Sequence, residues 1–109
     1  MDAEKLLRSL GATGNLKGFR YAIYMIELVE QDPTATTLIT KYLYPKTAGY
    51  FHISVSAVER ALRTVVNVCW ERCDPELLNM VTGARILNRP TNGMFLDMTA
   101  AYLRRQKAI

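Results

Sequence analysis

The sequence has no long apolar segment. Its longest uninterrupted apolar run covers only residues 21–26, whereas a membrane-spanning helix needs about 20 apolar residues. The first ten residues, MDAEKLLRSL, also lack the apolar block of a secretory signal. We therefore expect a soluble protein that acts in the cytoplasm and has no membrane partner.

The residues from which most metal and catalytic sites are built are scarce. Two cysteines and one histidine among 109 residues are too few for a disulfide framework or a usual zinc site. Cys69 and Cys73 are expected to be two small buried or half-buried side chains on one helix. The chain also lacks a glycine-rich phosphate loop and a paired-carboxylate motif, so the sequence predicts neither an enzyme nor a bound metal or cofactor.

Strand patterns are weak as well. The β-branched residues Val65, Val66 and Val68 lie within a helical period, and no alternating run is bounded by hairpin turns. The sequence therefore predicts an all-α fold of about six helices, winged-helix-like but without a clear wing, in a single domain over residues 1–109. Pro45 either kinks a helical segment or begins a separate helix. The predicted helical segments cover residues 5–10, 17–31, 36–44, 55–72, 75–82 and 92–107.

The charge is positive and unevenly placed. The net charge is +4, and residues 55–109 hold eight basic and five acidic side chains, against six and five in residues 1–54. A modest basic excess of this kind permits a polyanionic partner but does not require one.

Residues 44–63 have the pattern of a helix-turn-helix motif. Such a motif needs a small residue where the helices cross, here Ala48, and apolar residues beside the turn, here Phe51 and Ile53. The turn needs a residue that tolerates left-handed backbone geometry, and His52 is acceptable there. The pattern is typical of a DNA-binding motif, but a helical hairpin with the same pattern can serve packing alone.

The second helix of this motif, at about residues 55–72, is the predicted recognition helix. Either Ser54 or Ser56 can cap its start, and Ser56 to Glu59 has the spacing of a capping box. The predicted buried face holds Val58, Ala61, Leu62, Val65, Val68 and Cys69. The predicted outer face holds Ser56, Ala57, Glu59, Arg60, Arg63, Thr64 and Asn67.

This outer face has the chemistry to read a major groove. Arg60 can bond guanine O6 and N7, and Glu59 can accept a hydrogen bond from cytosine N4. A surface ion pair between Glu59 and Arg63 is the alternative explanation of those two residues. Base contacts are expected from Ser56, Glu59, Arg60 and Arg63. Contacts to the DNA backbone are expected from Lys17, Lys46, Thr64, Asn67 and Arg89.

Several segments together resemble one known family. They are Leu10-Gly11, Leu16-Lys-Gly-Phe19, Ile39-Thr-Lys-Tyr-Leu-Tyr-Pro45, Val58-Glu-Arg-Ala-Leu-Arg63 with Trp70, and Arg89-Pro-Thr-Asn92. In this order and spacing they resemble the C-terminal effector domain of stage-zero sporulation protein A, a response regulator of endospore-forming bacteria. The resemblance covers nearly the whole chain.

The resemblance implies a six-helix domain that binds short DNA boxes near promoters, in tandem or as a dimer. It also implies contact with the sigma subunit of RNA polymerase, and an association with the bacterial nucleoid. The family typically has an arginine at the position of Ala57 and a histidine at Thr64, so we expect the DNA box to differ or to be bound less tightly. A receiver domain would need roughly another hundred residues, so residues 1–109 are either an excised domain or a stand-alone relative. If the chain stands alone, phosphorylation is not expected to switch it in cis.

Two hypotheses for the function follow. The first is a transcription regulator that binds double-stranded DNA sequence-specifically through the helix at 55–72. The alternative is a protein-interaction module that pairs with a full-length regulator or with the polymerase sigma subunit, because Ala57 and Thr64 weaken the predicted DNA-binding face.

Overall fold

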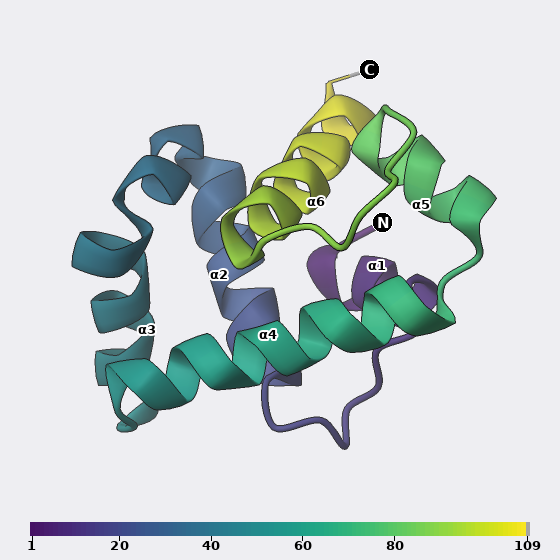
Figure 1. Ribbon diagram of the computed structural model, residues 1–109. Helices are drawn as coiled ribbons and strands as arrows, with labels where there is room; N and C mark the ends of the chain where they lie inside the picture. Colours follow the sequence, from purple (N-terminus) through teal and green to yellow (C-terminus); the bar gives the residue numbers. More distant parts are fainter. Residues whose placement is uncertain (109) are drawn as a thin grey trace.

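The computed structural model describes residues 1–108, and in this range the secondary structure is helical without strands (Figure 1). The predicted all-α fold is therefore confirmed. Residues 1–108 form six α-helices and two shorter helical segments, η1 and η2. Their bounds are α1 Ala3–Ser9, α2 Phe19–Gln31, η1 Pro33–Leu38, η2 Ile39–Leu43, α3 Tyr44–Phe51, α4 Val55–Arg72, α5 Pro75–Thr82 and α6 Asn92–Lys107.

The later helix boundaries follow from local capping chemistry. The Asp74 side chain accepts a hydrogen bond from the backbone N–H of Glu76, and Gly83 ends α5 in the left-handed conformation with φ 76°. The Thr91 side chain accepts from the backbone N–H of Met94 and so caps α6. Side chains of this kind satisfy N–H groups that have no partner within the helix. The predicted boundaries of these two helices are confirmed.

The segment before Pro45 differs from the prediction of one helical piece at 36–44. Residues 33–38 form a 3₁₀-helix and residues 39–43 a π-helical turn. Pro45 has no N–H, so it cannot bond the carbonyl four residues earlier, and the turn widens instead. In this wider turn the N–H of Tyr44 donates to the carbonyl of Ile39. Pro45 then lies in the first turn of α3, as one of the two predicted alternatives proposed.

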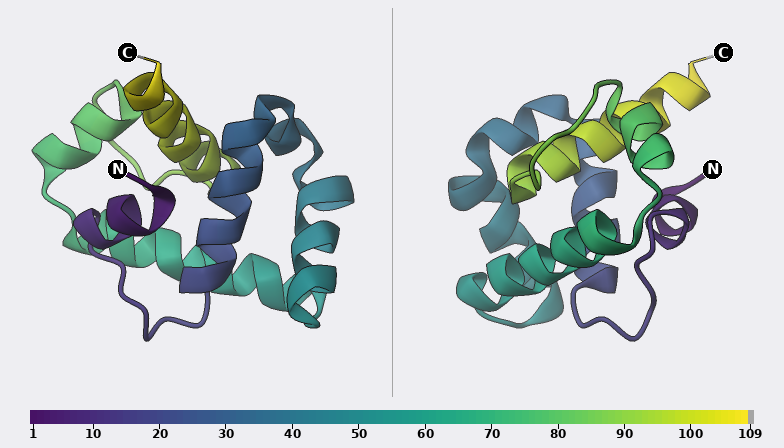
Figure 2. Two further views of the ribbon diagram at one scale, coloured as in Figure 1. Left: turned by 180° about the vertical axis from the view of Figure 1, so that it is seen from behind. Right: turned by 45° about the vertical axis from the view of Figure 1, so that its right-hand side comes forward.

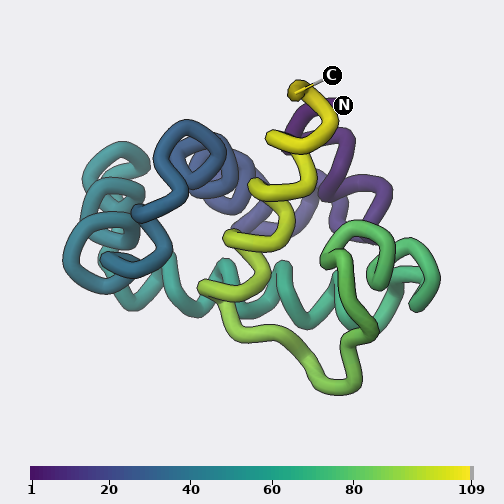
Figure 3. Tube along the Cα trace, turned by 90° about the horizontal axis from the view of Figure 1, so that it is seen from above, coloured from purple at the N-terminus to yellow at the C-terminus, as the bar shows by residue number. Residues whose placement is uncertain are grey.

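Helix α2 lies at the centre of the packing. It contacts α1, α3, α4 and α6, and Figures 1 and 2 show these helices arranged around it. Met25, Ile26 and Val29 of α2 are fully buried. The view from above shows α6 running across the direction of α4 (Figure 3). The core thus fixes α4 along one side of the molecule.

The buried face of α4 differs from the one that the periodicity predicts. Val58, Leu62, Val65 and Cys69 are buried as expected, but Val66 is fully buried too. Ala61 and Val68, which the periodicity predicts on the same face, are only half-buried. Val66 is buried because α4 contacts α2, α3 and α6, so the helix is covered from more than one direction.

Both thiols are buried, which is one of the two predicted alternatives. Cys69 lies in α4 and Cys73 at its C-terminal cap, and both cysteines are free. Burial raises the pKa of the Cys69 thiol to about 12, because a thiolate is poorly solvated in an apolar surrounding. Burial also raises the pKa of Cys73. Among residues 1–108, no helix has the length and apolar character needed to cross a membrane.

Candidate DNA interface

Helices α3 and α4 form a helix-turn-helix with a short turn at residues 52–54. His52 has φ 58° and ψ 47°, the left-handed conformation that was predicted for it. The backbone N–H groups of His52 and Ile53 both donate to the carbonyl of Ala48. These bonds cap the C-terminus of α3, and the left-handed conformation of His52 turns the chain toward α4.

Ser54, not Ser56, caps α4. Its side chain accepts a hydrogen bond from the backbone N–H of Ala57 over 3.1 Å. Because the turn is so short, Ser56 already lies in the first turn of α4, where it cannot be the capping residue. The predicted capping box from Ser56 to Glu59 is therefore wrong, and Glu59 is free for another partner.

The predicted core of the motif is confirmed. Ala48 is buried, Val58 is fully buried, and Phe51 and Ile53 are half-buried beside the turn. Phe51 packs against Tyr21, with ring centroids 4.7 Å apart. The apolar contacts lie on the inner sides of both helices, so the outer side of α4 is left for polar residues.

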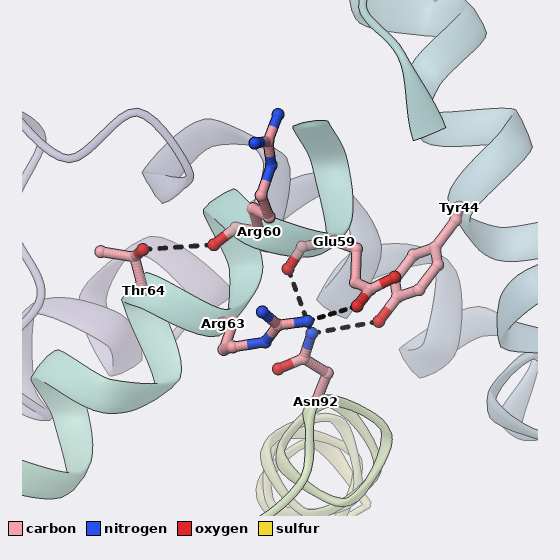
Figure 4. A network of polar contacts seen from close by, with 6 residues as sticks. All are labelled: Tyr44, Glu59, Arg60, Arg63, Thr64 and Asn92. Carbon is pink, nitrogen blue, oxygen red and sulfur yellow. Dashed lines mark hydrogen bonds and ion pairs between the residues drawn. The ribbon is translucent and has the colours of Figure 1, made fainter. Parts of the chain in front are cut away.

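The predicted outer side chains of α4 are at the surface. Ser56, Arg60, Arg63 and Thr64 are exposed, and Glu59 and Asn67 are half-buried, as is Ala57. Figure 4 shows Arg60, Arg63 and Glu59 as they leave the helix. The hydroxyl of Thr64 donates to the carbonyl of Arg60 over 3.2 Å, so in this structure it bonds its own helix.

The two arginines of this face differ in their partners. The guanidinium of Arg63 forms an ion pair with the carboxylate of Glu59, which is the alternative that the spacing allowed. Arg60 points away from this pair (Figure 4). Within residues 1–108 its guanidinium takes part in no hydrogen bond or ion pair, so all of its donors are available to a ligand.

A polar contact that the sequence did not predict lies beside this pair. The side-chain amide of Asn92 donates to the hydroxyl of Tyr44 over 3.1 Å and to the backbone carbonyl of Glu59 over 3.3 Å (Figure 4). Tyr44 is only 4% exposed, and burial raises the pKa of its hydroxyl, although the bond from Asn92 acts in the opposite direction. The sequence placed Asn92 at a helix start but held no signal for contacts this distant in the chain.

One side of the outer face is bordered by residues 13–18, here called the loop edge. A hollow lies between this loop and α4, lined by Asn15, Leu16, Lys17, Gly18, Ala57, Arg60, Ala61 and Thr64. Gly18 touches α4 so closely that a β-carbon there would lie 2.3 Å from the carbonyl oxygen of Ala61. Lys17 is exposed on this edge. Figure 2 shows the loop projecting beyond the helices.

The other side is bordered by residues 89–93, here called the α6 edge. A second hollow lies between α4 and this edge, lined by Ile39, Thr40, Tyr44, Glu59, Arg63, Arg89, Thr91, Asn92 and Gly93. Arg89 is exposed. The outer face of α4 therefore lies between two edges that each carry one exposed basic side chain. Lys46 is exposed on α3, with its Nζ 5.7 Å from the ring centre of Tyr42, and lines neither hollow.

Comparison with known families agrees with this geometry. The family model described as sporulation initiation factor Spo0A C terminal matches residues 3–103. This family is the DNA-binding effector domain of a sporulation regulator and not an enzyme family. The match extends from the start of α1 into the last turns of α6 and so includes α3, α4 and both edges. The chain belongs to the Spo0A C-terminal family of DNA-binding effector domains.

Proposed function

We propose that this chain, folded as one effector domain, binds double-stranded DNA sequence-specifically and regulates transcription, with α4 in the major groove. The observation that carries the proposal is the guanidinium of Arg60 on the outer face of α4, which has no hydrogen-bond or ion-pair partner among residues 1–108. A major groove admits one α-helix, and the two edges beside α4 bear Lys17 and Arg89, where the phosphates of the groove's two strands would lie.

The four proposed base contacts have different roles. Arg60 bonds guanine O6 and N7 through two N–H groups, and Glu59 accepts from cytosine N4. Arg63 contacts a base or a phosphate after it exchanges its bond to Glu59 for one to DNA. Ser56, in the first turn of α4, is exposed, and its hydroxyl can bond several base edges, so it adds affinity with little discrimination.

The proposed backbone contacts are Lys17, Lys46, Thr64, Asn67 and Arg89. Lysine and arginine neutralise phosphates and carry no sequence information directly. The hydroxyl of Thr64 reaches a phosphate only by giving up its bond to the Arg60 carbonyl. Asn67 is half-buried, so only part of its amide is available, and its proposed contribution is the smallest of the five.

Two positions shape the DNA box. Ala57 lines the loop-edge hollow beside Arg60 and offers only a methyl group, which suits an apolar contact with thymine. Thr64 lines the same hollow with a short polar side chain. We propose that the bound box therefore depends chiefly on Arg60 and on the Glu59–Arg63 pair.

Selection of bound oligonucleotides from a random pool tests this function. The expected result is an enriched box that contains a guanine–cytosine pair, bound more tightly than a scrambled sequence of the same composition. Titration at several salt concentrations should show affinity falling by about 0.9 log units per log unit of salt for each phosphate contacted. Equal affinity for the box and the scrambled sequence would refute specific reading and favour a protein-interaction module.

The proposed partners beyond DNA are a second copy of the chain on a tandem box and the sigma subunit of RNA polymerase. A bacterial cytoplasmic location with association to the nucleoid belongs to the same proposal. A supershift of the DNA complex by added sigma subunit, and a second band on a doubled box, are the expected results. If both experiments show only the complex of one chain with DNA, the proposed DNA binding stands and the two proposed protein partners are wrong.

A further inference from the structure

The side chain of Asn92 connects three helices at one point. Its amide nitrogen lies 3.1 Å from the hydroxyl of Tyr44 in α3 and 3.3 Å from the backbone carbonyl oxygen of Glu59 in α4, while Asn92 itself is the first residue of α6 (Figure 4). We propose that Asn92 is a positioning residue, which fixes the orientation of α4 for base reading. This inference rests on the proposed DNA-binding function.

The hydrogen-bonding capacity of the amide matches these contacts. A side-chain amide nitrogen carries two N–H donors, and Asn92 uses one for each acceptor. A backbone carbonyl has two lone pairs, so the Glu59 oxygen can accept from Asn92 and from its own helix at once. The hydroxyl of Tyr44 is held in a side chain that is 4% exposed, where the loss of a hydrogen-bond partner is costly. Removal of the Asn92 amide would therefore take a hydrogen-bond partner from a buried hydroxyl and from the backbone of α4.

The contact lies at the turn of α4 that reads DNA in the proposed function. Glu59 directly precedes Arg60, and Arg63 follows one turn later. A bond to the helix backbone limits how α4 rotates about its axis and shifts relative to α3. Hydrogen bonds to base edges tolerate only a few tenths of an ångström in donor–acceptor distance, whereas attraction to phosphates depends on charge and varies slowly with distance. Loss of Asn92 should therefore weaken base reading more than non-specific binding.

The experiment measures the affinities for box and scrambled DNA of three variants whose net charge is that of the unchanged chain. Asn92→Ala removes both donors, Tyr44→Phe removes one acceptor, and Asn88→Ala is the matched control, because Asn88 is an exposed asparagine in the preceding loop. The expected ratio of box affinity to scrambled affinity falls about tenfold in Asn92→Ala and about threefold in Tyr44→Phe. In Asn88→Ala the ratio stays as in the unchanged chain. Selection of oligonucleotides with Asn92→Ala should also return boxes that vary more at the base pairs read by Arg60, Glu59 and Arg63.

The outcomes separate this inference from the function on which it rests. If the unchanged chain shows no preference for any box, the proposed function is wrong. If the unchanged chain prefers a box and both Asn92→Ala and Tyr44→Phe keep the full ratio, only the positioning role is wrong. A purely structural role would lower both affinities equally, in line with a lower melting temperature, and that result too would overturn the inference. Should Asn92→Ala not fold, Tyr44→Phe decides the question.

Discussion

The two edges of α4 are held to it by different interactions. On the loop edge, Gly18 lies against the backbone of Ala61 with no space for a β-carbon. On the α6 edge, Asn92 bonds the backbone carbonyl of Glu59. One edge thus depends on shape and the other on hydrogen bonds. Both contacts involve the backbone of α4, so neither of them uses the side chain of Arg60.

The largest expected effect comes from a change on the loop edge. Gly18→Ala would place a carbon 2.3 Å from the Ala61 carbonyl oxygen and 2.7 Å from its carbonyl carbon, so loop or helix must move. We expect a loss of about 3 kcal/mol in the free energy of unfolding and a fall of more than about 10 °C in melting temperature. Thermal and urea denaturation followed by circular dichroism measures both.

Gly49→Ala is the matched control for this change. Gly49 lies in α3, and apart from its chain neighbours and the backbone of its own helix no described atom lies within 4 Å of the position of an added β-carbon. Alanine favours a helix over glycine by about 0.8–1.0 kcal/mol, so this variant should be slightly more stable than the unchanged chain. If Gly18→Ala were as stable as Gly49→Ala, the loop edge would not be closed by shape.

The next largest effect is a difference in DNA-box preference between substitutions of Arg60 and of Arg63, which line the two hollows. Arg60→Lys keeps the charge but loses the two-pronged contact with guanine, at a cost of about 1–3 kcal/mol in preference for the box. Arg63→Lys should change the preference less, because lysine can still pair with Glu59. Competition binding with box and scrambled DNA measures both variants. An equal or larger loss in Arg63→Lys would assign the main base contact to the α6 edge.

A smaller effect concerns the basic residue on each edge. The slope of log affinity against log salt is negative. If Lys17 and Arg89 each neutralise one phosphate, each change to alanine reduces the magnitude of this slope by about 0.9. The double change should lower it by about twice that amount. Lys5→Ala, on α1, is the control and should leave the slope unchanged. A slope that falls for only one of the two variants would show that DNA lies against a single edge.

The smallest effect is expected at the surface ion pair. Glu59→Gln removes the charge that Arg63 pairs with, and exposed pairs at this spacing contribute only about 0.3–0.5 kcal/mol to stability. The difference from the unchanged chain should become smaller in 1 M salt, where the Debye length is only about 3 Å. Urea denaturation at low and high salt measures it. A loss above about 1 kcal/mol that persists in high salt would mean that the pair is part of the core.

The fold could be predicted from the sequence because its helix boundaries depend on local chemistry. Asp74, Gly83 and Thr91 act at the ends of helices through their own side chains or backbone freedom. The segment before Pro45 was predicted less well, since a proline that ends one hydrogen-bond pattern does not reveal which wider or tighter turn replaces it. Val66 was missed because its burial depends on how many neighbours cover α4.

The candidate site was predictable to a similar extent. The outer face of α4 follows from the period of the helix, so the exposure of Arg60 and Arg63 could be expected. The choice of Ser54 as the cap depended on the length of the turn, which two serines so close together leave open. The contacts of Asn92 and Gly18 join residues distant in the chain, and periodicity carries no information about such pairs.

The burial of both cysteines has a practical consequence for fluorescence work. Cys69 is 1% and Cys73 9% exposed, and with a pKa of about 12 the Cys69 thiol remains protonated in neutral buffer, whereas maleimide dyes react with thiolates. A cysteine introduced through Ser56→Cys would therefore react far faster than either native thiol. The folded chain then accepts one dye at the start of α4 without prior removal of its own cysteines.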